Sequence, residues 1–179
     1  MTDRFRLTLA QLNPVLGDID GNIAKARAAW DSARAEGADM VAFPEMFVTG
    51  YNTQDLVLKP AFHQAAIAAI QALATQCAEG PAIGIGGPAL EAGKLHNAYY
   101  ILQCGQISAQ VHKHHLPNYH VFDEERLFQP GDVTGPYVVA GVRIGSPICA
   151  DAWFEDVAET LAETGAEFLL VPNGSPYFR

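Results

Sequence analysis

Short apolar runs alternate with longer amphipathic segments along the chain, and this alternation constrains the fold more than any other feature. Residues 39–43 (DMVAF) form a nearly continuous apolar run, as expected of a strand buried within a sheet. An amphipathic helix is predicted on each side, over 20–36 and 59–79, because apolar or small residues recur three and four positions apart. Asp20 is the expected N-cap of the first helix, and Gly37 is expected to end it.

Further strands and two hairpins complete the predicted pattern. The additional elements are strands over 5–12, 82–90 and 167–172, a strand pair over 97–113 around Cys104-Gly105, a second pair over 137–149, and a helix over 153–164. The run EFLLVP (167–172) is so uniformly apolar that we expect it at the centre of a sheet. Helices alternating with strands predict an α/β fold in which helices cover one face of a mixed sheet and a second sheet covers the other. We expect all 179 residues to form one domain.

Composition excludes several classes of function. The net charge is −9 and no basic patch is visible, so we expect no nucleic-acid partner. No apolar run reaches the roughly 20 residues of a membrane span, and the first residues lack the apolar core of a signal peptide. Three cysteines without Cys-x-x-Cys spacing favour a reducing compartment over a disulfide framework or a structural zinc site. We therefore expect a cytoplasmic protein.

Three chemically distinct side chains each stand just past a predicted strand. They are Glu45 in FPEMFVTGY (43–51), Lys113 in HKHHLPNYHVFDEERLFQPG (112–131) and Cys149 in SPICADAW (146–153). A carboxylate, an ammonium group and a thiol can serve as base, oxyanion stabiliser and nucleophile in amide hydrolysis. Cys149 precedes the predicted helix, whose dipole would lower the pKa of the thiol.

Each of these residues also has a simpler interpretation. A lone cysteine is usually buried and inert, and Cys77 and Cys104 fit that description; Glu45 could be a solvated loop residue and Lys113 a surface lysine. The segment after Lys113 favours the functional interpretation over these simpler ones. It mixes aromatic and acidic residues in a long loop, and such loops are usually functional. Its histidines could suggest a metal, but no partnering Cys/Asp set stands at ligand spacing, so we expect none.

These three segments resemble those of the nitrilase superfamily, and the resemblance covers essentially the whole chain. Within the superfamily the chain is most similar to the glutaminase domains of glutamine-dependent NAD synthetases. The resemblance implies a four-layer α-β-β-α sandwich and a catalytic triad of Glu45, Lys113 and Cys149. It also implies substrate contacts at Tyr119, Phe122, Glu124 and Ser175. The backbone N–H of Ala150 would bind the oxyanion.

The same resemblance implies a glutamine amidohydrolase that supplies ammonia for NAD synthesis. Such an enzyme would need no cofactor for hydrolysis, and ATP would serve only a synthetase domain outside this chain. The resemblance also implies a homo-oligomer. Two departures stand out. Ala150 replaces the usual acidic residue after the nucleophile, and the family's domains continue beyond Arg179, so we expect a domain that is incomplete at its C-terminus. A free-standing amidase or carbamoylase and an inactive fragment acting as an interaction module remain alternatives.

Overall fold

A five-stranded mixed sheet lies at the centre of the computed structural model, which describes residues 4–175. Its strands follow the order β1 (Leu7–Leu9), β2 (Met40–Ala42), β3 (Ala82–Glu91), β4 (Lys94–Gln103) and β5 (Gln106–His112). The first three strands are parallel, and the last two are added as an antiparallel meander. The β4–β5 turn has Cys104 and Gly105 at positive φ, as the predicted hairpin requires.

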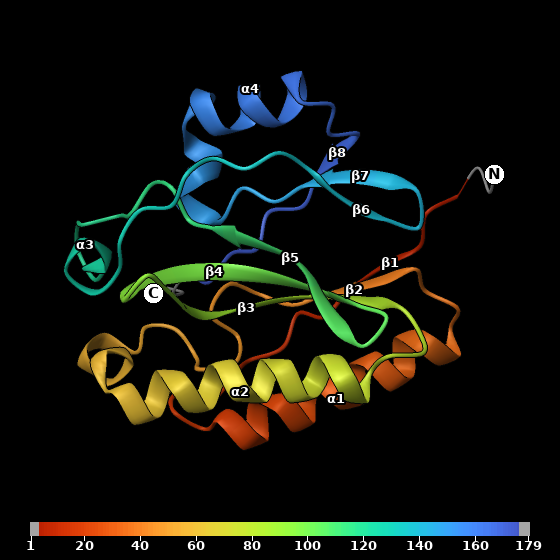
Figure 1. Ribbon diagram of the computed structural model, residues 1–179, viewed down its shortest axis with the longest axis horizontal. Helices are drawn as coiled ribbons and strands as arrows, with labels where there is room; N and C mark the ends of the chain where they lie inside the picture. The colour runs from red at the N-terminus through yellow and green to blue at the C-terminus, as the bar shows by residue number, and fades with distance from the viewer. Residues whose placement is uncertain (1–3, 176–179) are drawn as a thin grey trace.

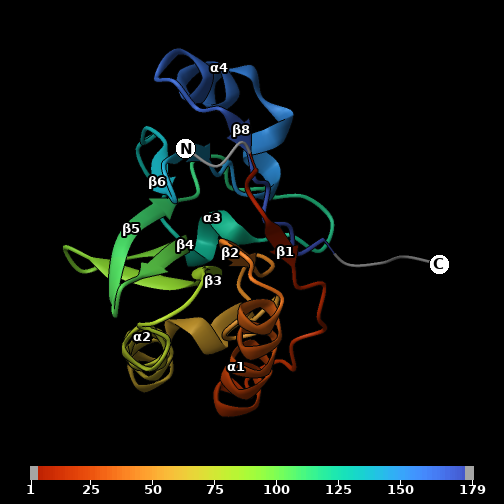
Figure 2. The ribbon, with the colours of Figure 1, turned by 90° about the vertical axis from the view of Figure 1, so that its right-hand side faces the viewer.

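Two helices and a second sheet cover the two faces of this central sheet. Helices α1 (Ile19–Ala35) and α2 (Pro60–Gln76) lie side by side on one face, as Figure 1 shows. The three-stranded sheet of β6 (Tyr137–Val139), β7 (Val142–Gly145) and β8 (Phe168–Leu169) faces the other side, with α4 (Glu155–Glu163) outside it (Figures 1 and 2). This is the predicted four-layer α-β-β-α sandwich. No helix within the described residues has the length and apolar character needed to span a membrane.

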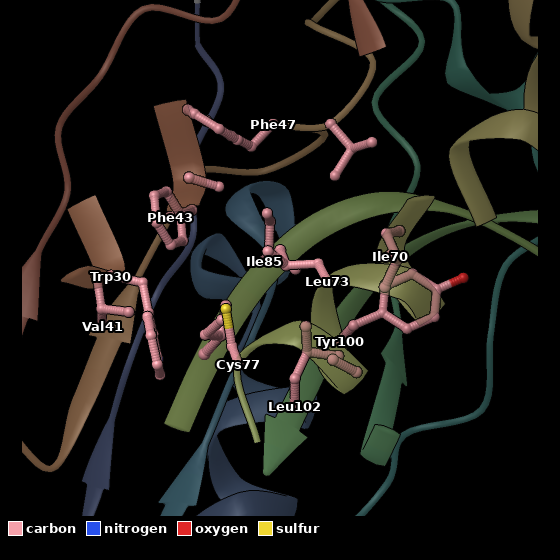
Figure 3. Close-up of a cluster of buried hydrophobic side chains, with 14 of the residues drawn as sticks. Trp30, Val41, Phe43, Phe47, Ile70, Leu73, Cys77, Ile85, Tyr100 and Leu102 are labelled. Atoms are coloured by element: carbon pink, nitrogen blue, oxygen red, sulfur yellow. The ribbon is translucent and has the colours of Figure 1, made fainter. Parts of the chain in front are cut away.

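Apolar cores fill both spaces beside the central sheet. Trp30 of α1 and Ile70 of α2 pack against Val41 and Ile85 of the sheet (Figure 3), and the Trp30 indole donates a 2.9 Å hydrogen bond to the carbonyl of Pro81. A second core lies between the two sheets, where Met40, Tyr99 and Ile101 meet Tyr137 and Ile144. Because both faces of β2 and β4 are buried, their sequences show no polar alternation.

Gly86 of β3 allows the segment that follows β2 to cross the sheet closely. A Cβ atom at this position would lie 2.2 Å from the backbone nitrogen of Met46, which no side chain tolerates. The Gly86 carbonyl accepts a 3.1 Å hydrogen bond from the Val48 N–H. The glycine therefore sets the path of the loop that carries Glu45.

The structure differs from the sequence predictions at several boundaries. Asp18, not Asp20, caps α1, because its carboxylate accepts a 3.0 Å hydrogen bond from the Gly21 N–H while Asp20 already lies in the first turn. The helix expected from residue 153 begins at Glu155, after a 3₁₀ turn (Cys149–Trp153). A second 3₁₀ turn (Gln54–Leu58) precedes α2, and the short helix α3 spans Glu124–Leu127.

The run EFLLVP also differs from its prediction. Only Phe168–Leu169 forms a strand, and within the described residues β8 pairs with β7 alone, at the edge of its sheet. Leu170 is buried, whereas Leu169 and Val171 are 43% and 41% exposed. Within the described residues, the side of β8 away from β7 therefore has no paired strand.

Candidate active site

A buried ion cluster joins three of the residues singled out in the sequence. Glu45 follows β2, Lys113 follows β5 directly, and Glu124 is the first residue of α3. The Lys113 Nζ lies 2.7 Å from Oε1 of Glu45 and 2.8 Å from Oε2 of Glu124, and all three side chains are completely buried. The fold thus brings two carboxylates, one from the segment after β2 and one from the start of α3, onto one ammonium group.

The charges in this cluster stabilise one another. Burial by itself would lower the pKa of Lys113, but the two carboxylates outweigh it and raise the pKa, so the ammonium is charged at neutral pH. The pKa of Glu124 is raised by burial and by the nearby charge of Glu45, although Lys113 opposes the shift. Because one cation faces two buried carboxylates, a further buried charge in this cluster would change the stability of the folded protein.

Two side chains that the sequence analysis missed complete the cluster. The Asn97 amide donates to Oε1 of Glu45 at 2.8 Å and to Oε1 of Glu124 at 3.3 Å. The Tyr51 hydroxyl donates to the same Glu124 oxygen at 2.8 Å, and burial raises the pKa of Tyr51 so that the hydroxyl keeps its proton. Tyr51 ends the motif FPEMFVTGY and could have been found there. Nothing in the sequence marks Asn97, which lies on β4 and reaches Glu45 through the pairing of β2 with β3 and of β3 with β4.

Cys149 begins the 3₁₀ turn next to this cluster. Its side chain is nearly buried, its backbone adopts a φ of 48°, and its sulfur lies 3.9 Å from the hydroxyl oxygen of Ser175. The Cys149 N–H donates to the carbonyl of Pro172 at 3.0 Å, which ties the turn to the segment after β8. A left-handed backbone conformation in a non-glycine residue is uncommon and clusters at functional sites.

The expected lowering of the thiol pKa is wrong. Burial raises the pKa of Cys149 to about 11, the charge of Glu45 adds to this increase, and Lys113 only partly offsets it. The five-residue 3₁₀ turn separates Cys149 from α4, whose dipole acts only within its first turn. The thiol therefore carries its proton at neutral pH and needs a neighbouring base to become a nucleophile.

Asp151 is a further residue that the sequence analysis did not assign. It is almost fully buried and accepts hydrogen bonds from the backbone N–H groups of Ile148, at 2.9 Å, and of His114 and His115, at 3.1 and 2.7 Å. This carboxylate fastens the turn that carries Cys149 to the loop that follows Lys113. Its position two residues after the cysteine, within CADAW, was the available signal.

The other predicted contacts are distributed over two cavities. A cavity of about 580 Å³ is lined by Ala150, exposed Tyr119 and the histidines at 114 and 115, among other residues. A second, of about 360 Å³, is lined by Ser175, Glu45 and Tyr51. Phe122 lines neither; its ring packs 6.2 Å from Tyr51 and 5.3 Å from Tyr119, measured between ring centroids.

Among residues 4–175, two groups of side chains could bind a metal ion. One consists of Glu91, His96 and His112, and the other of His114, His115 and Asp156. The sequence analysis found no carboxylate at ligand spacing from the histidine run. Asp156 supplies one from α4, because the fold brings the loop and the helix together.

Comparison with known proteins identifies the family. The carbon-nitrogen hydrolase family matches residues 6–178. The chain is 58% identical over 179 residues to a glutamine-dependent NAD(+) synthetase of Rhodobacter capsulatus, covering 100% of this chain and 32% of that protein. It is 35% identical to the glutamine-dependent NAD(+) synthetase of Thermotoga maritima, covering 97% and 31%. The chain thus spans about a third of the length of these relatives.

Solved structures agree on the fold. A glutamine-dependent NAD+ synthetase from Acinetobacter baumannii superposes with a TM-score of 0.88 at 32% identity, over 97% of this chain and 33% of that one. An amidase from Nesterenkonia sp. AN1 superposes with a TM-score of 0.82 at 22% identity, over 95% and 67%, and shares the fold. Together with the family match, these similarities show that the chain belongs to the carbon-nitrogen hydrolase family.

Proposed function

We propose that this chain hydrolyses the side-chain amide of glutamine and releases ammonia through a thioester on Cys149. The observation that carries the proposal is the buried Glu45–Lys113–Glu124 cluster beside a protonated thiol. Similarity to proteins described as glutamine-dependent supports glutamine as the amide donor. A protonated thiol beside a carboxylate suits a nucleophile that is activated only when substrate is in place.

The first half of the reaction makes the thioester. Glu45 takes the proton of Cys149, and the sulfur attacks the carbonyl carbon of the amide. The charged Lys113 and the Ala150 N–H stabilise the oxyanion of the tetrahedral intermediate; one such donor is worth about 10²–10³ in rate. The intermediate collapses when Glu45 returns its proton to the leaving nitrogen, so the C–N bond breaks and ammonia departs.

The second half regenerates the enzyme. Glu45, again a carboxylate, takes a proton from a water molecule, and the resulting hydroxide attacks the thioester carbon. The C–S bond breaks, glutamate leaves, and the thiolate recovers the proton from Glu45. A base held in position contributes about 10²–10⁴ in rate.

The surrounding residues have distinct proposed roles. Glu124 is fully buried against Lys113, which suits a residue that holds the ammonium in place. Ser175, beside the thiol and lining the cavity with Glu45, is placed to contact the substrate amide. For Tyr119 and Phe122, which pack on each other, we propose contacts with the amino-acid end of glutamine.

The proposed products indicate a partner. Ammonia would be consumed by an ATP-dependent synthetase part, which corresponds to the portion of the relatives that this chain does not span. The proposed hydrolytic steps themselves use only groups of this chain and water. NAD synthesis is therefore proposed for the whole protein rather than for this chain.

Replacement of the nucleophile tests the assignment. The variant Cys149→Ala should fold normally but release no ammonia or glutamate from glutamine above background, whereas the exposed control Cys104→Ala should retain turnover. Intact-mass measurement of rapidly quenched wild-type protein should show a glutamyl adduct that Cys149→Ala lacks. Turnover by Cys149→Ala would refute the nucleophile, and faster hydrolysis of simple aliphatic amides than of glutamine would refute the substrate.

A further inference from the structure

A cluster of two histidines and an aspartate lies outside the proposed catalytic machinery. Nε2 of His115 is 2.9 and 3.0 Å from the two carboxylate oxygens of Asp156, and Nε2 of His114 is 3.9 Å from one of them. We propose that His114, His115 and Asp156 form a binding site for a borderline divalent transition metal such as Zn²⁺.

The spacing of the three donor atoms suits such an ion. Zn–N and Zn–O bonds of about 2.0–2.2 Å in a tetrahedron place neighbouring ligand atoms about 3.3 Å apart. The observed separations of 2.9 and 3.9 Å lie on either side of this value, and all three donors lie within 4.8 Å of one another. A small side-chain rotation would therefore close the site without moving the backbone.

The orientation of His114 points to a ligand between the rings and the carboxylate. Its Nδ1 lies 2.7 Å from the carbonyl oxygen of Gly131, so this nitrogen carries the proton. In the neutral ring the lone pair is then on Nε2, which faces the Asp156 carboxylate, another acceptor. A cation between these two acceptors would satisfy both. A backbone carbonyl on the far nitrogen is also the usual outer partner of a metal-binding histidine.

The second cluster provides an internal comparison. The rings of His96 and His112 are stacked with an interplanar angle of 9°, and Nδ1 of His112 lies 3.6 Å from the Glu91 carboxylate while its Nε2 contacts Gln110 at 2.6 Å. The rings of His114 and His115 are instead inclined at 86°, so their lone pairs can converge on one point. The cluster with Asp156 also has the shorter histidine–carboxylate separation, 2.9 Å against 3.6 Å.

The donor set defines the class of ion. Two imidazoles with one carboxylate suit Zn²⁺, Co²⁺ or Ni²⁺, whereas Mg²⁺ and Ca²⁺ prefer oxygen ligands alone. Three protein ligands leave a coordination position for water or another small ligand. Because the two histidines also line the 580 Å³ cavity, this position borders the same cavity as Ala150.

Metal binding should link two segments of the active site. His114 and His115 follow Lys113, and Asp156 lies in the first turn of α4, shortly after the turn with Cys149. Asp151 already joins these segments on the buried side. A bound ion would join them on the exposed side as well and raise the thermal stability of the protein.

The test uses the untagged protein that carries this chain, freed of metal with EDTA. It is titrated with Zn²⁺ by calorimetry and with Co²⁺ by visible absorption. We expect one equivalent per chain, and the variants His115→Gln and Asp156→Asn should each weaken binding by at least about 10-fold. Asp156 is 55% exposed, so Asp156→Asn should fold normally. The control His120→Asn removes an exposed histidine from the same loop at a positive φ that asparagine tolerates, and it should bind like wild type.

Two results would overturn the proposal. One is the absence of saturable binding in the wild-type protein. The other is binding that both variants leave unchanged, which would assign the ion to a different site. In either case the His115–Asp156 contact is an ordinary surface hydrogen bond.

Discussion

The variant Lys113→Met tests the balance of charge in the buried cluster. Methionine has nearly the same shape but carries no charge, so Glu45 and Glu124 would face each other without their cation. Removal of one partner from a buried ion pair costs about 3–5 kcal/mol of unfolding free energy. With a urea slope of about 2 kcal/mol/M, the unfolding midpoint should fall by roughly 1.5–2.5 M.

The loss should depend on pH with a predictable sign. The pKa of Glu124 is already raised by burial when Lys113 is present, and without the lysine this carboxylate would bind a proton more readily in the folded state. A carboxyl with a raised folded-state pKa contributes stability at low pH and loses it as pH rises. Lys113→Met should therefore lie closer to wild type at pH 5 than at pH 8. The exposed control Lys94→Met should be nearly neutral at both values.

A second substitution makes the reasoning refutable. Glu124→Gln alone should destabilise the wild-type protein, because Lys113 loses a partner at 2.8 Å. The same change made in Lys113→Met should stabilise the variant, because it removes one of two repelling buried carboxylates. Urea unfolding followed by circular dichroism measures all four proteins. A loss below about 1 kcal/mol in Lys113→Met, or an additive loss in the double variant, would contradict the charged cluster.

Three further predictions follow from the same geometry. Asn97→Asp replaces the donor to Glu45 by a third buried carboxylate, so the unfolding free energy measured in urea should fall by several kcal/mol. The loss should be larger at pH 8 than at pH 5, and an unchanged stability would contradict the contact. Gly86→Ala should cost at least about 1–3 kcal/mol in unfolding free energy and lower kcat, whereas Gly135→Ala, whose Cβ would meet its nearest atom at 3.7 Å, should do neither. In a variant without the other two cysteines, the rate of Cys149 alkylation should keep rising toward pH about 11. Glu45→Gln should shift this profile to lower pH, because the charge of Glu45 raises the pKa of the thiol. A profile that levels off near neutrality would instead show a free thiolate.

Several elements of the fold were predictable because their causes are local. Residues 39–43 and 82–90 contain strands, and 20–36 and 59–79 contain helices, because hydrophobic periodicity and turn residues act over a few positions. Boundaries were less predictable where two side chains compete for one role, as Asp18 and Asp20 did at the start of α1. Strand order was beyond the sequence for EFLLVP, since pairing is decided by distant segments.

The sequence by itself determined which side chains stand at strand ends. Glu45 and Cys149 stand shortly after predicted strands and Lys113 directly after one, each in a recognisable motif. Only the tertiary structure added Asn97, Asp151 and Asp156, whose partners lie far away in the chain. It also decided that the thiol of Cys149 keeps its proton, because a pKa reflects burial and neighbouring charge, and both are created when separate segments pack together.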